Sequence, residues 1–263
     1  MPRFSANLSM MFTEVAPLDR PAAARDAGLD AIEIQFPYDL GLDAFARAVE
    51  RAGLPVAVFN IPVGDMLTGG PGLAAMPGRE PAFRDAVAEA RRFAEALQPR
   101  NVNVLTGFPP PEIDRAAAMA TLARNLAHAG EALAPIGVRV TVEAVNSRDR
   151  PGYFLTRTEQ ALAALDQADH ANVYLEYDVY HMQIMEGDLI PTLTRNLDRI
   201  GHIQFADTPG RHQPGTGEIN FTNLFGALDD LGYAGFVGAE YVPTGTTLDS
   251  LDWLEAARDH GGI

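Results

Sequence analysis

Short apolar runs alternate with longer stretches of helical period along the whole chain. The short runs are rich in β-branched residues, whereas the longer ones repeat apolar residues at intervals of three and four. This alternation is typical of βα units that are repeated around a parallel sheet. We count eight such units, and they predict strands at residues 4–10, 31–36, 56–60, 102–105, 139–143, 173–178, 202–205 and 236–240.

Several of the longer stretches carry specific helix signals. Residues 80–97 have a proline in the first turn, and residues 112–133 repeat apolar side chains with helical spacing. A helix after the seventh strand is expected to begin at Asn220 or Thr222, because both are suitable N-caps. Gly232 is placed to end that helix.

Eight βα units in about 250 residues predict an α/β fold, the (β/α)8 TIM barrel, as a single domain over residues 1–263. A doubly wound open sheet would usually carry a glycine-rich phosphate loop, and no GxGxxG or GxxxxGKS/T motif occurs. Two long loops, residues 61–78 and 207–220, follow the third and seventh strands. Because active sites in barrels lie where strands end, we expect both loops to cover the site.

Oxygen-bearing residues stand at the ends of the last four predicted strands: Glu143, Asp178, Gln204 and Glu240. Neighbouring parallel strands lie about 4.8 Å apart, so these side chains can converge near the barrel axis. Three carboxylates placed together would repel one another without a cation. Carboxylate and amide oxygens suit Mg²⁺ or Mn²⁺ better than zinc. The sequence therefore predicts one divalent metal, Mg²⁺ or Mn²⁺, bound by these four residues.

The composition excludes several kinds of chemistry. Cysteine and lysine are both absent, which excludes thiol nucleophiles, cysteine-type metal sites and lysine Schiff bases. The net charge of -15 disfavours nucleic acid as a partner, because phosphate binding depends on clustered basic residues. No secretory signal and no apolar run of about 18–20 residues is found, so we expect a soluble cytoplasmic protein without a membrane partner. The oligomeric state stays open, a homo-oligomer included.

Six segments carry motifs of one known family: FPYD at residues 36–39, FNIPVGD at 59–65, PGRE at 77–80, VEAVNSRDRPGYFL at 142–155, DVYHMQIMEGDL at 178–189 and GHIQFADTPGRHQPGTGEINF at 201–221. With these segments the chain resembles the hydroxypyruvate isomerase family, within the xylose-isomerase-like barrels, over essentially its whole length. The histidine that related ketose epimerases use as third ligand is replaced here by Gln204, which points to the isomerase branch.

This resemblance implies a metal-dependent isomerase of the aldose-ketose type, an intramolecular oxidoreductase, that acts on a small 2-oxo acid. It matches Glu143, Asp178, Gln204 and Glu240 to the family's metal ligands and implies acid/base roles for Glu143 and Glu240. The implied reaction moves a proton from C3 of hydroxypyruvate to C2 through an enediolate and gives tartronate semialdehyde (2-hydroxy-3-oxopropanoate). A divalent cation would stabilise that enediolate.

Two further residues are predicted to bind the substrate. His181 lies in DVYH, three residues beyond the carboxylate that ends the sixth strand, and is placed to reach a substrate oxygen. Arg211 lies in the glycine-rich loop after Gln204, where a planar guanidinium could pair with the substrate carboxylate. His202 and Glu33 share strand faces with other polar residues, so they are expected either to pack inside the barrel or to contact the substrate.

Related activities stay open. A 2-oxo-tetronate isomerase performs the same type of reaction on an acid one carbon longer and shares these motifs. A ketose 3-epimerase, or a lyase such as an inosose dehydratase, would use much of the same machinery, and the product formed from a small panel of substrates would distinguish them. A metal-dependent apurinic endonuclease on a related barrel is disfavoured by the acidic charge and by six scattered histidines.

Overall fold

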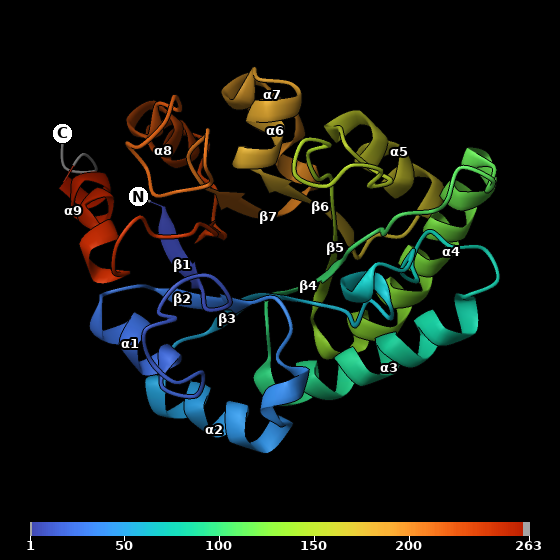
Figure 1. Ribbon diagram of the computed structural model, residues 1–263, viewed down its shortest axis with the longest axis horizontal. Coiled ribbons are helices and arrows are strands. Elements are labelled where there is room, and N and C mark those ends of the chain that lie inside the picture. Colours follow the sequence, from blue (N-terminus) through green and yellow to red (C-terminus); the bar gives the residue numbers. More distant parts are fainter. Residues whose placement is uncertain (1, 260–263) are drawn as a thin grey trace.

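Eight parallel strands close into a barrel in the computed structural model, which describes residues 2–259 (Figure 1). Each strand pairs with the next one along the chain, and the last pairs with the first. This topology confirms the predicted (β/α)8 TIM barrel. The strands are β1 (Arg3–Asn7), β2 (Ala31–Ile34), β3 (Val56–Asn60), β4 (Asn101–Val104), β5 (Arg139–Glu143), β6 (Val173–Asp178), β7 (Ile200–Phe205) and β8 (Phe236–Ala239).

The observed strands differ from the predicted ones only at their ends. The predicted bounds of β3, β5 and β6 are the observed ones. Strand β1 ends at Asn7 instead of Met10, because the chain turns there: the backbone N–H groups of Met10 and Met11 donate to the Asn7 carbonyl. Strand β8 ends just before Glu240. The polar residues of interest therefore stand at strand ends or directly after them.

Helices surround the barrel on its outer side (Figure 1). The predicted helix at residues 80–97 is observed, and the next one begins after Asp114, whose side chain accepts the Ala117 N–H. Asn220 caps the helix after β7 by accepting the Asn223 N–H, which selects it over Thr222. Within residues 2–259, no helix is both long and apolar enough to cross a membrane. The α-helices are α1 (Arg20–Asp26), α2 (Leu42–Ala52), α3 (Glu80–Leu97), α4 (Arg115–Leu133), α5 (Thr158–Ala168), α6 (Val179–Met185), α7 (Leu189–Asn196), α8 (Phe221–Asp230) and α9 (Asp252–Asp259).

Short 3-10 helices occupy several of the connections. They are η1 (Tyr38–Leu40), η2 (Met66–Thr68), η3 (Ala134–Ile136), η4 (Leu197–Arg199) and η5 (Leu248–Ser250). The segment η2 lies within the long loop after β3, so part of that loop has regular structure of its own.

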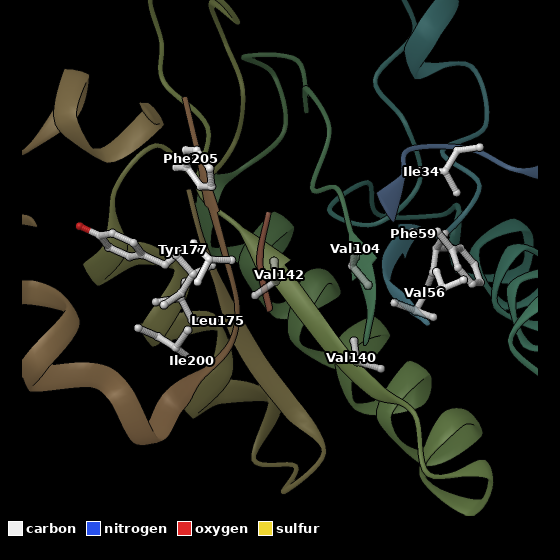
Figure 2. Close-up of a cluster of buried hydrophobic side chains, with 14 of the residues drawn as sticks. Ile34, Val56, Phe59, Val104, Val140, Val142, Leu175, Tyr177, Ile200 and Phe205 are labelled. Carbon is white, nitrogen blue, oxygen red and sulfur yellow. The ribbon is translucent and has the colours of Figure 1, made fainter. Parts of the chain in front are cut away.

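The apolar core lies between the strands and the surrounding helices. Alternate strand residues enter it, as Val140 and Val142 of β5 and Leu175 and Tyr177 of β6 show (Figure 2). These side chains are almost fully buried. Because successive side chains of a strand point to opposite faces, the residues between them face the barrel interior.

Polar side chains fill much of the barrel interior. Glu33 accepts a hydrogen bond from Ser5 Oγ (2.5 Å), lies 2.7 Å from His202 Nε2 and accepts another bond from Gln204 Nε2 (2.8 Å). Strands β2 and β7 are not neighbours in the sheet, so the contact between Glu33 and His202 crosses the interior. Both residues are fully buried. They pack inside the barrel, one of the two roles expected for them.

Gly238 on β8 leaves the space that Glu33 occupies, because a Cβ added at Gly238 would overlap the Glu33 carboxylate. We expect Gly238→Ala to lower the free energy of unfolding by about 1–3 kcal/mol, the usual cost of overpacking. Urea denaturation monitored by circular dichroism measures this loss. Gly226→Ala is the control, since a Cβ there meets nothing within 4 Å and α8 gains helix propensity. Equal stability of the two variants would contradict the expectation.

Candidate metal centre and active site

A pocket of about 270 Å³ lies where the strands end at their carboxyl-terminal side. Its volume is at the small end of ligand pockets, which suits a small molecule. Met66 and Leu67 of the loop after β3 and Arg211 of the loop after β7 line it, so both long loops reach the site as expected. The predicted site residues that line this pocket are Glu143, His181, Gln204, Arg211 and Glu240.

Three buried side chains of the site could hold a metal ion: the ligand atoms of Glu143, Asp178 and His181 all lie within 4.8 Å of one another. His181 Nε2 is 3.6 Å from Glu143 Oε1 and 3.5 Å from Asp178 Oδ2. Glu143 ends β5, Asp178 ends β6 and His181 follows in the first turn of α6. The fold therefore brings these groups together because neighbouring parallel strands end at the same rim.

Glu240 is connected to this group through Arg211. The Arg211 Nη2 atom lies 2.6 Å from Glu240 Oε2 and 3.6 Å from Asp178 Oδ2. The second oxygen of Glu240 accepts hydrogen bonds from Asn7 Nδ2 (3.0 Å) and Gln35 Nε2 (2.9 Å). The Glu240 carboxylate is thus held from three sides, and the Arg211 charge is shared between two carboxylates.

Gln204 is oriented from inside the barrel. Its Nε2 atom donates to Glu33 Oε2, and Glu33 is in turn held by Ser5 and His202. Burial raises and the His202 charge lowers the pKa of Glu33, and the net effect lowers it. Burial lowers and the Glu33 charge raises the pKa of His202, and here the net effect raises it. Both shifts favour the charged forms of Glu33 and His202, and Gln204 keeps its carbonyl oxygen as the free donor atom for a ligand.

The hydrogen bonds around His181 define which of its nitrogens carries the proton. Asn146 Oδ1 accepts the Asp149 N–H (2.8 Å), so the Nδ2 group of Asn146 is the one that lies 2.6 Å from His181 Nδ1. Nδ1 of His181 must then accept, which puts the proton on Nε2. Burial, followed by the charges of Arg211 and Arg150, lowers the pKa of His181 well below its usual value. The neutral ring therefore presents an Nε2–H donor to the site.

Buried carboxylates crowd the site and change one another's pKa. Burial raises the pKa of Glu143 well above its usual value, and Glu176, Glu240 and Asp178 raise it further. Burial also raises the pKa of Asp178 to about 7, against the opposing charge of Arg211. Carboxylates crowded in this way retain protons unless a cation is close. The donor set, mostly carboxylate and amide oxygen, fits a hard divalent cation.

Glu176 belongs to the site although it was not among the predicted residues. It lines the pocket, accepts a hydrogen bond from Thr141 Oγ1 (2.6 Å), and burial raises its pKa to about 8. Its position two residues before Asp178, on the same face of β6, is the signal in the sequence that could have identified it.

The loop that carries Arg211 is organised around Asp207. Asp207 is fully buried, and its two carboxylate oxygens accept backbone N–H groups along the loop. The donors are Thr208 (2.9 Å), Gly215 (2.9 Å), Gly217 (2.8 Å) and Ile219 (3.1 Å). These bonds hold the glycine-rich segment in one conformation and so place Arg211 in the pocket.

The whole barrel has relatives among known proteins. Residues 21–257 match the family described as xylose isomerase-like TIM barrel. The chain belongs to this family. Among curated proteins, a 2-oxo-tetronate isomerase of Cupriavidus necator is 44% identical, with 97% of this chain and 98% of that protein covered. A hydroxypyruvate isomerase of Escherichia coli is 42% identical, with 98% of this chain and 100% of that protein covered.

A solved structure within the same range of similarity is described as an AP endonuclease, family 2, from Brucella melitensis. It has a TM-score of 0.94 and 41% identity, and the match covers 97% of this chain and 99% of that chain. The names of the curated relatives in this xylose isomerase-like family confirm the prediction that the chain is an isomerase enzyme.

Proposed function

We propose that the protein is a divalent-metal-dependent isomerase that interconverts hydroxypyruvate and tartronate semialdehyde. The observation that carries this proposal is that two buried glutamates, Glu143 and Glu240, line one small pocket at the rim, and that His181 and Arg211 connect them to the nearby Asp178. Nothing in a pure binding site requires two buried acid/base groups of this kind. The full-length similarity to the hydroxypyruvate isomerase of Escherichia coli supports the choice of substrate.

The proposed metal ligands are Glu143, Asp178, Gln204 and Glu240, with Mg²⁺ or Mn²⁺ as the ion. A divalent cation supplies positive charge that stabilises the negative charge developing on the substrate oxygens when a C–H proton leaves. Glu33 contributes by holding the Gln204 amide nitrogen, so that the carbonyl oxygen faces the pocket. His181 is left out of the ligand set because its Nε2 carries a proton.

The chain's own residues carry the protons. One of Glu143 and Glu240 removes the proton from C3 of hydroxypyruvate and returns it to C2. The other glutamate moves the hydroxyl proton from the C3 oxygen to the C2 oxygen, so the C3–H and O–H bonds that break are matched by a C2–H and an O–H bond that form. Burial, followed by the neighbouring carboxylates, raises the pKa of Glu143, and a bound cation would oppose this shift.

The two proposed substrate-binding residues line the pocket, and each keeps a hydrogen-bond donor. His181 offers its Nε2–H, and Arg211 offers an Nε–H that is buried and has no hydrogen-bond partner within residues 2–259. A buried donor without a partner is costly in the free protein, so a substrate oxygen that accepts from it gains binding energy. The Arg211 charge itself is balanced by Glu240 and Asp178.

A second candidate is 2-oxo-tetronate isomerase, because the relative from Cupriavidus necator that carries this name is 44% identical over 97% of the chain. The same proton transfer would then act on an acid one carbon longer. For both candidate activities, the substrate is a small 2-oxo acid. The net charge of -15 opposes a nucleic-acid substrate, including the one suggested by the endonuclease description of the Brucella structure. A cytoplasmic location remains part of this proposal.

The test of the proposed function is turnover by metal-stripped protein that has been reloaded with Mg²⁺ or Mn²⁺. Hydroxypyruvate and 2-oxo-tetronate are offered side by side in D₂O, and proton transfer is followed by NMR. We expect conversion of hydroxypyruvate to tartronate semialdehyde that falls at least about 100-fold on metal removal, since a Lewis acid contributes several kcal/mol. Preference for the four-carbon acid would select the second candidate. Turnover that does not depend on added metal would contradict the mechanism.

A further inference from the structure

Arg150 is a second arginine at the same pocket, and its charge is unpaired. It lies in the loop between β5 and α5 and lines the pocket together with Arg211. Arg150 is exposed, and its guanidinium makes no hydrogen bond or ion pair with any residue in the described part of the chain, 2–259. Its charge acts on the buried ring of His181, as does that of Arg211, which places it near the site.

The pocket needs such a charge if its ligand is an anion. Glu143, Glu176 and Glu240 line the walls, and they would repel an incoming carboxylate wherever the proposed cation does not offset their charge. The charge of Arg211 does not offset this repulsion, because it is engaged by Glu240 at 2.6 Å and Asp178 at 3.6 Å. Among the residues that line the pocket, Arg150 is therefore the arginine whose charge remains free.

The backbone holds Arg150 where the pocket opens. Its N–H donates to the Asn146 carbonyl (3.2 Å), and its own carbonyl accepts the Tyr153 N–H (3.1 Å). Arg150 also borders an outer cavity of about 570 Å³, which it shares with Met66 and Leu67 of η2. The side chain thus stands between the outer cavity and the inner pocket on a fixed backbone, with freedom to meet an incoming ligand.

We propose that Arg150 is a specificity-determining residue that pairs with the carboxylate of the 2-oxo acid substrate. This inference rests on the proposed function and deepens it, because it assigns to Arg150 the carboxylate pairing that the sequence alone suggested for Arg211. Arg211 then serves the substrate through its free Nε–H. A guanidinium suits this task because it can grip a carboxylate with two parallel hydrogen bonds.

The test compares Arg150→Met and Arg150→Lys with Arg148→Met in the metal-loaded protein. Arg148 is an exposed arginine of the same loop that does not line the pocket, so its variant changes the net charge equally. We expect Arg150→Met to raise the KM for hydroxypyruvate about 10- to 100-fold, the range for losing a hydrogen bond to a charged group, with kcat changed less than about threefold. Arg150→Lys should restore part of the loss. Arg148→Met should leave KM unchanged.

Dihydroxyacetone, which replaces the carboxylate by an uncharged CH₂OH group, tests the charge directly. Its inhibition constant as a competitor should be the same in wild type and Arg150→Met. An equal loss for the charged and uncharged compounds, or a KM that matches that of Arg148→Met, would overturn the assignment while leaving the isomerase intact.

Absence of wild-type turnover would instead refute the proposed function, and calorimetric titration with hydroxypyruvate would then decide the inference. Binding that Arg150→Met weakens at least tenfold supports the anion site. Absence of binding, or equal binding by both proteins, overturns it.

Discussion

Glu143→Gln is expected to lower the turnover of hydroxypyruvate about 100-fold or more, the scale of general-base catalysis. Glutamine has the shape of glutamate but cannot accept the substrate proton. The variant should fold as well as the wild type or better, because within residues 2–259 the Glu143 side chain accepts only a weak hydrogen bond of 3.5 Å, from Asn103, and its carboxylate neighbours repel it. Steady-state kinetics and thermal unfolding, measured on the same preparation, check both halves of this expectation.

The control for this experiment is Glu218→Gln, which removes a carboxylate from the same rim but outside the pocket. Glu218 is exposed and accepts a hydrogen bond from Gln183 Nε2 (3.2 Å). Its variant should keep turnover within about twofold, as surface substitutions usually do. Near-normal turnover of Glu143→Gln would remove Glu143 from the mechanism. A large loss of stability alongside the lost activity would show that Glu143 acts in folding instead.

Glu240→Gln should also lower turnover, but its stability is expected to change in the opposite direction. The Glu240 carboxylate is the close partner of Arg211 and accepts from Asn7 and Gln35 as well. In the variant, one N–H group of the glutamine amide would face the N–H donors of Arg211. The buried Arg211 charge would then be less well paired. The stability changes of the two variants therefore distinguish Glu143, whose neighbours repel its charge, from Glu240, whose neighbours stabilise it.

The location of the site was predictable because the barrel topology determines it. Parallel strands end at one rim, so residues at or next to the ends of neighbouring strands, such as Asp178 and Gln204, must lie close together. The register agrees, since Asp178 and Gln204 are paired directly between β6 and β7. The end of a strand can be recognised in the amino-acid sequence because the apolar run stops there.

The side-chain partners inside the site were not predictable in the same way. Arg211 was predicted to pair with the substrate carboxylate, and the sequence did not indicate that its guanidinium also contacts two carboxylates of the protein, Glu240 and Asp178. That contact joins residues about thirty positions apart and depends on how Asp207 folds the loop between them. The proton position on His181 likewise depends on Asn146, whose amide orientation follows from a backbone bond to Asp149. Such contacts carry no periodic signal in the sequence.

Glu33→Gln is expected to weaken both the fold and the metal site, because Glu33 joins them. The variant removes the counter-ion of the buried His202 and leaves an unpaired group where the pair stood. Breaking a buried pair from one side typically costs about 3–5 kcal/mol. Gln204 would also lose the acceptor that orients its amide, and loss of such a supporting contact typically weakens metal binding about 10- to 100-fold.

The stability loss in Glu33→Gln should depend on pH with a defined sign. The raised pKa of His202 contributes stability that is complete below its unfolded value of about 6.5 and is lost as the pH rises through the folded value. The lowered pKa of Glu33 contributes stability that is present above its unfolded value of about 4.3 and is lost as the pH falls through the folded value. Both contributions overlap between about pH 4.5 and 6.5, so the deficit of the variant should be larger at pH 6 than at pH 9.

Urea denaturation at these two pH values measures the deficit, and calorimetric titration with Mn²⁺ measures the metal site. Glu95→Gln is the control, since it removes the carboxylate of an exposed ion pair with Arg91 on α3, for which we expect a change below about 1 kcal/mol. A deficit in Glu33→Gln that is equal at both pH values would show that the charge of the pair is not its source. Unchanged Mn²⁺ affinity would show that Gln204 is either oriented without Glu33 or absent from the ligand set. A loss of both quantities, with the expected pH dependence, would establish that one carboxylate inside the barrel supports the fold and the chemistry at its rim.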